Sequence, residues 1–426
     1  MHVMLLGAGG FIGRYILTEL LAAGDEVTAT VRSVGSLDQA FPSVRFIEID
    51  LAKSTDKATW HPLVEGVDCL INTAGVLRGP TMQAIHVDMP AAFYAAAAKA
   101  GAKRAVLLSA ISARPNVETD YARSKLQGEK VLRSSGLDWT ILRPSLVYGD
   151  GSYGGTSLIR GFAGLPCVVP IPGNGEYAFT PIHARDLARG IVKLCEGAEY
   201  AGQTLEPVGP ETLELRSILA RYRAWLGFGK ARVLSIPMPV IRSMGRIGDI
   251  FGNGPVSTNS LEQMVAGNAG DSTAYARAIG FPQLSMDEAL FARPAQVQDR
   301  WHARLFFLPP AIKAVLVLLW IGSAILGLAY GAEATAQLLA RLNLPPEWAP
   351  AAMILGSAID LAVAAIVLLD QRARRSTAIQ LAVVLGYTAI LTVGIPELWL
   401  DPLGPLLKNL PILALIFVHG AIGDRR

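Results

Sequence analysis

Charged residues are scarce in this sequence. Asp, Glu, Lys and Arg make up 17% of its 426 residues, whereas 51% are hydrophobic; a soluble protein usually carries about a quarter charged residues. The shortage is concentrated after about residue 310, so we expect that part of the chain to lie in a different environment. Such high hydrophobicity excludes intrinsic disorder, which requires a chain with too little apolar surface to bury.

Signatures of disulfides, metal sites and nucleic-acid binding are also missing. The three cysteines, Cys69, Cys167 and Cys195, are far apart without C-x-x-C spacing, and the six histidines form no H-x-x-x-H pair. We therefore expect reduced core thiols and no metal. The net charge is +3 and the longest basic cluster is formed by the arginines at 372, 374 and 375, which argues against a nucleic-acid partner.

The start of the sequence has no basic segment followed by a cleavable apolar one, because the first apolar residues run directly into a glycine loop. We therefore expect the N-terminal part of the chain to stay in the cytoplasm.

Up to about residue 143, short apolar runs alternate with helical patterns, which is typical of βαβ units and a parallel sheet. The predicted helices are Phe11–Ala23, Ala84–Ala100 and Tyr121–Ser135, each followed by a glycine suited to a helix end. The runs show little polar alternation, as expected for strands covered on both faces. The predicted strands are Val3–Leu6, Val27–Val31, Val44–Glu48, Cys69–Asn72, Ala105–Leu108 and Trp139–Leu142.

The later residues suggest three further parts. Gly- and Pro-rich stretches between about 148 and 294 predict a smaller substrate lobe. We assign 1–150 to an α/β Rossmann-like domain with a doubly wound parallel sheet, 151–295 to the lobe, 296–310 to a linker and 311–426 to a membrane domain.

The membrane domain is predicted from four apolar stretches, each close to the ~20 residues that cross a bilayer as a helix. They are Ala311–Tyr330, Pro350–Leu369, Thr377–Ile395 and Leu406–Ile422, and they predict an all-α four-helix transmembrane bundle. Asp360 lies in the middle of the second stretch. We interpret it either as a proton or quinone contact or as a polar clamp between helices.

Orientation follows from the loops, because short loops rich in Lys and Arg stay cytoplasmic. One side carries most of the basic residues: Arg300, Arg304, Lys313, Arg372, Arg374, Arg375, Arg425 and Arg426. The opposite loops carry Arg341 and Lys408. We therefore predict a multi-pass protein of the cell (inner) membrane with both termini in the cytoplasm.

A glycine loop between the first strand and the first helix predicts a dinucleotide site. It reads Gly7-Ala8-Gly9-Gly10-Phe11-Ile12-Gly13. Gly7 and Gly10 allow a tight turn close to a pyrophosphate, and Gly13 allows the helix to pack against the sheet. The helix start, at Phe11 and Ile12, presents free N–H groups and a positive dipole to the anion.

Residues at other strand ends indicate which nucleotide binds. An acidic residue after the second strand would select NAD, but this chain has Thr30-Val31-Arg32-Ser33. Arg32, assisted by Arg14, can pair with a 2′-phosphate, unless both are simply solvated. The sequence therefore favours NADP, with NAD as the alternative. We expect Asp50 and Leu51 to reach the adenine and Thr73, Ala74 and Gly75 to approach the dinucleotide.

Tyr121 and Lys125 lie four residues apart, on one face of the predicted helix after the fifth strand. A tyrosine acts as an acid or base near neutral pH only if its pKa falls from ~10. An adjacent ammonium favours the phenolate, so we expect Lys125 to lower the pKa of Tyr121 and to hold the nicotinamide ribose.

In this order the motifs resemble an extended or atypical short-chain dehydrogenase/reductase, a group that includes an accessory subunit of respiratory complex I. The resemblance spans about residues 1–290 and adds Arg143-Pro144, Tyr148-Gly149 and the 181–186 segment Pro-Ile-His-Ala-Arg-Asp. It implies hydride transfer, with Pro144 near the cofactor and a Ser or Thr that polarises the substrate carbonyl. Ala110 occupies that place, so Ser109 or Ser112 is the candidate. The last segment resembles a DoxX-like four-span domain.

Two functions remain open. One is a membrane-anchored NAD(P)-dependent oxidoreductase or epimerase acting on a lipid-soluble or lipid-linked substrate, such as a quinone, a polyprenyl or sterol-like alcohol, or a lipid-linked sugar. The other is a non-catalytic NADPH-binding redox sensor or assembly factor of a membrane complex, because the atypical group contains members that bind nucleotide without known turnover.

Overall fold

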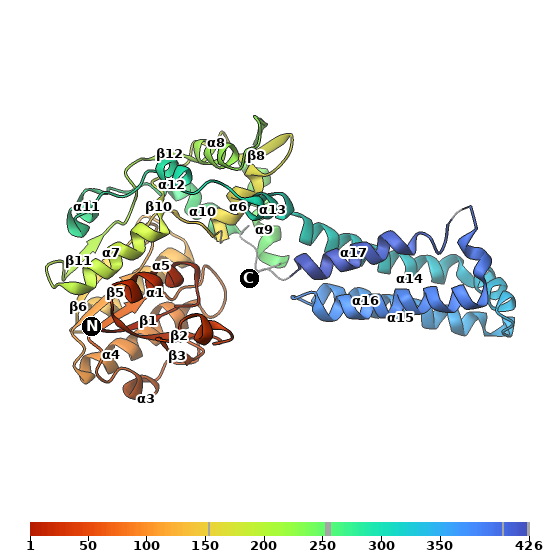
Figure 1. The fold of residues 1–426 in the computed structure, drawn as a ribbon, viewed down its shortest axis with the longest axis horizontal. Coiled ribbons are helices and arrows are strands. Elements are labelled where there is room, and N and C mark those ends of the chain that lie inside the picture. The colour runs from red at the N-terminus through yellow and green to blue at the C-terminus, as the bar shows by residue number, and fades with distance from the viewer. Residues whose placement is uncertain (152–153, 252–256, 403, 424–426) are drawn as a thin grey trace. The chain divides into compact units, whose positions relative to one another are not determined.

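The computed structural model describes residues 1–426 except 152–153, 252–256, 403 and 424–426. The chain divides into two compact units, Met1–Arg304 and Leu305–Arg426 (Figure 1). The arginines at 425 and 426, which contributed to the predicted orientation, lie outside the described residues.

The first unit is built on a parallel sheet of seven strands in the order β11-β6-β5-β4-β1-β2-β3. The chain order reverses between β1 and β4, and an α/β sheet binds ligands beyond the carboxyl ends of the strands at such a point. The predicted Rossmann-like fold and its six strands are confirmed, and β11 is an additional strand. The bounds are β1 His2–Leu6, β2 Glu26–Val31, β3 Arg45–Glu48, β4 Cys69–Asn72, β5 Arg104–Leu108, β6 Asp138–Leu142 and β11 Gln203–Leu205.

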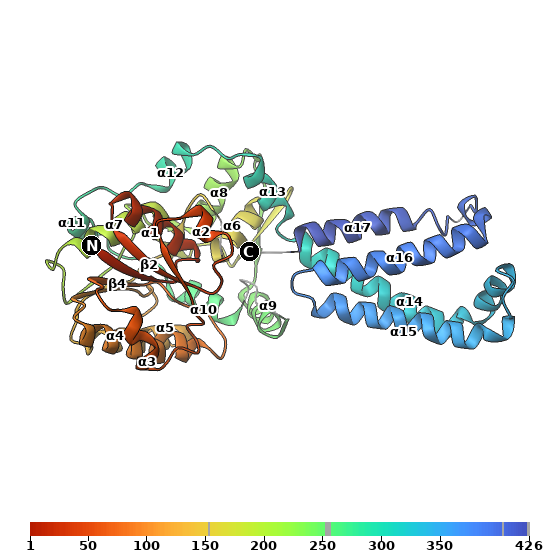
Figure 2. The ribbon, with the colours of Figure 1, turned by 60° about the horizontal axis from the view of Figure 1, so that its bottom comes forward.

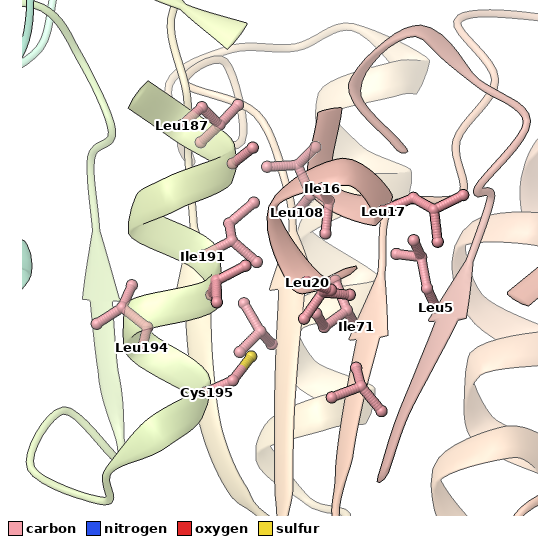
Figure 3. Packing of buried hydrophobic residues seen from close by; sticks show 14 of the residues in the cluster. Leu5, Ile16, Leu17, Leu20, Ile71, Leu108, Leu187, Ile191, Leu194 and Cys195 are labelled. Atoms are coloured by element: carbon pink, nitrogen blue, oxygen red, sulfur yellow. The ribbon is translucent and has the colours of Figure 1, made fainter. Parts of the chain in front are cut away.

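Helices cover both faces of this sheet (Figure 2). On one face, α1 (Phe11–Ala22) and α7 (Ala184–Glu196) contribute side chains such as Ile16 and Ile191 to one buried cluster that includes Leu5, as Figure 3 shows. On the other face, α4 (Met89–Ala100) and α5 (Asp120–Arg133) pack against residues such as Leu6. Both alternating sets of β1 side chains are therefore buried, which explains the continuous apolar run.

Two local expectations need correction. The predicted helix Ala84–Ala100 consists of a π-helical segment, Ala84–Asp88, followed by α4. Cys167 is exposed, whereas Cys69 and Cys195 are buried as expected. The π-helical segment matters for the site because wider turns of this kind are frequently found next to functional residues.

The substrate lobe has its own core around Tyr148, Ile218 and Tyr222. It contains β7 Val147–Tyr148, α6 Gly154–Ala163, β8 Val168–Pro172, β9 Ala178–Phe179, β10 Ile182–His183, β12 Leu213–Glu214, α8 Leu215–Trp225, β13 Arg232–Ile236, α9 Met238–Phe251, α10 Thr258–Ala266 and α12 Met286–Ala292. The helix α11 Thr273–Ile279 packs instead into the core beside α7.

Residues 296–310, which we predicted to be a linker, contain the helix α13 (Val297–Leu305). Arg160 lies 4.9 Å from the Trp225 ring centroid and pairs with Asp299 of α13 at 3.6 Å. A Cβ on Gly164 would come within 2.6 Å of the Ala303 carbonyl oxygen. These contacts hold α13 against the lobe, so the division between units falls at its end, after Arg304.

The second unit consists of α14 Leu308–Arg341, α15 Ala349–Leu369, α16 Arg374–Gly394 and α17 Asn409–Ile422. Among the described residues, three helical segments are long and apolar enough to cross a membrane: 308–341, 346–369 and 374–394. α17 has only 14 residues, fewer than the ~20 that a straight crossing needs. The apolar helical region is thus confirmed, with three helices of spanning length where we expected four.

Polar contacts join these helices, and two of them link α14 to α15 and to α16. Asp360 on α15 accepts a hydrogen bond from the Ser323 hydroxyl of α14 at 2.6 Å. The Trp320 indole of α14 donates to Gln380 Oε1 of α16 at 3.0 Å. The first contact supports the clamp interpretation of Asp360, because a paired polar group inside a bundle links two helices.

Candidate active site

The glycine loop opens α1 at the carboxyl edge of the sheet. Gly7 has a φ of +83°, which glycine adopts without strain, and its carbonyl accepts the Gly10 N–H at 3.0 Å. A Cβ on Gly13 would lie 2.2 Å from that carbonyl oxygen. α1 therefore starts directly against the loop, and no side chain among the described residues forms a capping hydrogen bond at Gly10. Its N–H groups at Phe11 and Ile12 are placed for an anion.

The segment after β4 lies beside this loop. The Thr73 hydroxyl donates to the Leu6 carbonyl at 2.7 Å, and the Ala74 N–H donates to Asn72 Oδ1 at 3.0 Å. A Cβ on Gly7 would be 2.9 Å from Thr73 Oγ1. The two motifs, about 60 residues apart in sequence, therefore meet where the strand order reverses.

The residues expected at the adenosine end are at neighbouring strand ends. Arg32 directly follows β2 and Arg14 lies in the first turn of α1; both are exposed, and neither forms an ion pair within the described residues. Asp50 follows β3, accepts the Ala52 N–H at 3.1 Å and is exposed, whereas Leu51 is half-buried. Both arginine forks are thus available to a phosphate.

α5 brings the Tyr121/Lys125 pair to the same edge. Thr119 caps the helix by accepting the Ala122 N–H at 3.1 Å. Lys125 is buried, and its Nζ donates to the Leu108 carbonyl at 3.1 Å, 5.9 Å from the Tyr121 ring centroid. A Cβ on Gly75 would be 3.2 Å from this Nζ. The lysine therefore contacts the segment after β4 directly.

His86 belongs to this constellation, although the sequence did not mark it. Its Nε2 accepts the Val76 N–H at 3.1 Å and its Nδ1 lies 2.8 Å from Ser124 Oγ. Because Nε2 accepts, the proton is assigned to Nδ1. The Ser124 hydroxyl donates onward to the Tyr121 carbonyl at 2.9 Å, and the His86 and Tyr121 rings meet edge to face, 5.7 Å apart. His86 thus connects the segment after β4 to α5.

The π-helical segment carrying His86 packs unusually close to α5. A Cβ on Gly128 would lie 2.3 Å from the His86 carbonyl oxygen, so only glycine at 128 permits this approach. In sequence, the available signals were a lone histidine in an alanine-rich helical pattern and a glycine inside another helix. Neither indicates the contact by itself.

Burial controls the ionisation of the site. It raises the pKa of Tyr121 to about 12 and lowers the pKa of Lys125 to about 8, an effect that the Glu129 carboxylate partly opposes. Burial and the Lys125 charge lower the pKa of His86 to about 3. The expected lowering of the Tyr121 pKa by Lys125 is therefore wrong for this structure: desolvation dominates, and the ammonium is directed at the Leu108 carbonyl.

The Ser109 hydroxyl, which we expected to polarise a substrate carbonyl, has a different partner in the structure. Its hydroxyl donates to Glu129 Oε1 at 2.7 Å, and Glu129 is fully buried and held by Arg143 at 2.8 and 2.6 Å. A hydroxyl has one proton to donate, so Ser109 belongs to this ion pair rather than to a substrate carbonyl. Ser112 is buried, and Pro144 is tied to the same loop because its carbonyl accepts the Ile111 N–H at 2.9 Å.

A pocket of about 490 Å³ lies at the N-terminus of α5, within the usual size range of small-molecule sites. In the wall of this pocket, Arg78 forms an ion pair with Asp249 at 3.5 Å, and the Asn259 amide donates to the Leu77 carbonyl at 2.6 Å. The lining is polar and comprises Arg78, Gly79, Met82, Glu118, Thr119, Asp120, Arg123, Asp249, Thr258, Asn259 and Glu262. Because Asp120 precedes Tyr121, the pocket is a candidate for the polar part of a substrate.

Comparison with family models matches residues 7–163 to the NAD(P)H-binding family and residues 317–417 to the DoxX-like family. The chain therefore contains an NAD(P)H-binding domain of the atypical short-chain dehydrogenase/reductase type, followed by a DoxX-like domain. The resemblance derived from the glycine loop, the segment after β4 and the Tyr121/Lys125 pair is thereby confirmed.

Individual relatives of this NAD(P)H-binding chain differ in their activities. A ceramide reductase from Caulobacter vibrioides is 28% identical over 254 residues, covering 58% of this chain and 78% of the relative. Subunit 9 of the alpha subcomplex of mitochondrial NADH dehydrogenase (ubiquinone) from Rattus norvegicus is 27% identical over 267 residues, covering 59% and 67%. A nucleoside-diphosphate-sugar epimerase structure from Staphylococcus aureus matches in fold, with a TM-score of 0.55, 15% identity and coverage of 68% and 99%.

Proposed function

We propose that this chain is a membrane-anchored, NADP-dependent oxidoreductase that acts on a lipid-soluble or lipid-linked substrate. The observation that carries the proposal is the position of Lys125, whose Nζ lies 3.2 Å from where a Gly75 Cβ would be. This contact supports an active-site role for the Tyr121/Lys125 pair, because Gly75 follows β4 at the carboxyl edge of the sheet. An ammonium and a phenol at that point suit proton transfer to or from a substrate oxygen.

The residues have separate tasks in this proposal. A nucleotide bound at this edge would supply or accept a hydride at C4 of its nicotinamide. Tyr121 transfers the proton at the substrate oxygen, and Lys125 holds the ribose hydroxyls through its Nζ. His86, neutral because of its low pKa, keeps Val76 and Ser124 in place on either side. The glycine loop and the α1 N-terminus neutralise the pyrophosphate.

The preference for NADP rests on Arg32 and Arg14. The residue after β2 is an arginine, and no acid stands there to accept the ribose 2′-hydroxyl that distinguishes NAD. Both guanidinium groups are exposed at this edge and unpaired within the described residues. NAD binding, the alternative, would leave both arginines solvated.

The lipid nature of the substrate is inferred from two features. The described part of the chain carries three helices of membrane-spanning length, which would tether the protein to a bilayer, and one relative is a reductase of ceramide. The polar pocket beside Tyr121 would receive the head of such a molecule. The predicted cytoplasmic orientation of the N-terminal unit, in a cell (inner) membrane, would give it access to NADPH.

The test uses detergent-purified full-length chain, NADPH carrying deuterium at C4, and an extract of native membrane lipids. We expect mass spectrometry to find label in a lipid product, and Tyr121→Phe to abolish the label while NADPH still binds. Tyr177→Phe is the matched control, because Tyr177 is partly buried against the core of the lobe rather than at the nucleotide edge. Labelling that persists in Tyr121→Phe would overturn the assignment of the proton donor.

A second function is favoured by a specific observation. Ser109 is committed to Glu129, and Ala110 occupies the place where the family has a carbonyl-polarising Ser or Thr. A non-catalytic NADPH-binding sensor, or an assembly factor of a membrane complex, needs no such hydroxyl. Tight NADPH binding with no labelled product would support this alternative, in which the nucleotide stabilises the fold by mass action.

A further inference from the structure

The helix α9 of the substrate lobe exposes a continuous apolar stripe. Val240, Met244 and Ile247 follow one another at helical spacing on one face and are 49%, 50% and 55% exposed. A different side of α9 is the one that packs: Gly245 is buried, and a Cβ there would lie 3.2 Å from the Thr258 amide nitrogen of α10. The position of α9 beside α10 can be followed in Figure 2.

The remaining face of α9 is basic. Arg242 and Arg246 are exposed and form no ion pair within the described part of the chain. The only acidic residue in the helix sequence, Asp249, pairs with Arg78 at 3.5 Å. The helix therefore combines an open apolar face with an uncompensated positive face. That combination is typical of helices that lie in the interface of a bilayer rather than of helices that cover a protein core.

We propose that α9 lies in the surface of an anionic lipid bilayer, with Val240, Met244 and Ile247 at the boundary between headgroups and acyl chains. The described part of the same chain also contains helices of membrane-spanning length, which supports a bilayer as the occupant of this face. Asp249 and the start of α10 also line the 490 Å³ pocket. Docking of α9 therefore brings that pocket to the level of the lipid headgroups, independently of whether the site is catalytic.

The test uses the full chain in lipid nanodiscs, with single-cysteine labels in a Cys167→Ser background, because Cys69 and Cys195 are buried. An environment-sensitive fluorophore is attached at Met244→Cys or Val240→Cys, and at Lys57→Cys, an exposed position on α3 (Lys57–Trp60), as the control. Lipids with a nitroxide high on the acyl chain quench a label only at short range. We expect strong quenching and a blue-shifted emission at 240 and 244, and little quenching at 57.

Charge provides the second measurement. Each arginine near an anionic surface contributes about five-fold to the docking equilibrium. Arg242→Gln with Arg246→Gln should therefore reduce quenching at 244 in anionic nanodiscs and have little effect in zwitterionic ones, as should added salt in the unsubstituted chain. Equal quenching at 244 and 57 would overturn the proposal. Energy transfer between labels on two copies, without lipid quenching, would also overturn it and assign the face to a second copy of this chain.

Discussion

Replacing Gly13 by alanine should weaken nucleotide binding more than any comparable change in the glycine loop. A Cβ at this position would lie 2.2 Å from the Gly7 carbonyl oxygen and 2.9 Å from the Ala8 Cα. Non-bonded heavy atoms prefer about 3.5–4.0 Å, so α1 or the loop must move by about 1 Å or more. Both neighbours are backbone atoms and cannot rotate away.

The size of the effect follows from the cost of overpacking. Forcing one extra methyl into a filled site costs about 1–3 kcal/mol, which corresponds to about 5- to 150-fold in a binding constant when the strain is borne by the bound state. We expect the NADPH dissociation constant of Gly13→Ala to rise within that range. The reason is that separating α1 from the loop removes its N–H groups from the pyrophosphate.

Gly9→Ala is the matched control. The nearest heavy atom to its Cβ would be Val31 Cγ1 at 3.6 Å, an ordinary contact, so NADPH affinity should change by no more than about two-fold. Affinity is measured by fluorescence titration of the detergent-purified full chain at fixed salt. Thermal unfolding with and without NADPH reports whether each variant is folded and stabilised by the ligand.

Equal affinities of Gly13→Ala and Gly9→Ala, in folded protein, would refute the assignment of the nucleotide to this loop. Gly10→Ala is a second test variant, which is used if Gly13→Ala does not fold. Its Cβ would lie 3.2 Å from the Gly7 carbonyl oxygen, a milder overlap, so we expect an affinity between those of the other two variants.

Three further outcomes are expected. Because burial lowers the Lys125 pKa to about 8, the ammonium is lost as pH rises through that value, and kcat/KM should fall above about pH 8. Lys125→Arg should shift this fall to higher pH. A flat pH profile in the unsubstituted chain would contradict a role for the charged lysine. His86→Ala leaves the Val76 N–H without its acceptor and should lower stability by about 1–3 kcal/mol. His86→Gln should recover part of this loss in thermal unfolding. Unchanged stability in His86→Ala would show that the link to Ser124 is dispensable. Asp360→Asn keeps a hydrogen-bond partner for Ser323 and should leave activity and stability nearly unchanged. Asp360→Leu should lower the stability of the helix bundle by about 0.6–2 kcal/mol. Loss of activity in Asp360→Asn with intact stability would instead favour a proton contact.

Much of the first unit was predictable because its signals are local. Strands buried on both faces read as short apolar runs, and Met4 and Leu5 show this by facing opposite layers of the core. The glycine loop, the segment after β4 and the Tyr121/Lys125 pair were predictable for a related reason. In a parallel sheet the residues after every strand meet at one edge, so sequence order is enough to bring them together.

Only the tertiary structure decided the features that depend on approach between distant segments. His86 meets Ser124 because the π-helical turn and Gly128 let two backbones come close, and no spacing in sequence encodes that contact. The Ser109 hydroxyl donates to Glu129 because Arg143, which follows another strand, stabilises the buried Glu129 carboxylate there. The direction of the Tyr121 pKa shift likewise depends on how much solvent the folded chain removes. The sequence alone therefore determined the sheet and the edge where the site lies, whereas packing determined which side chains at that edge remain free to act.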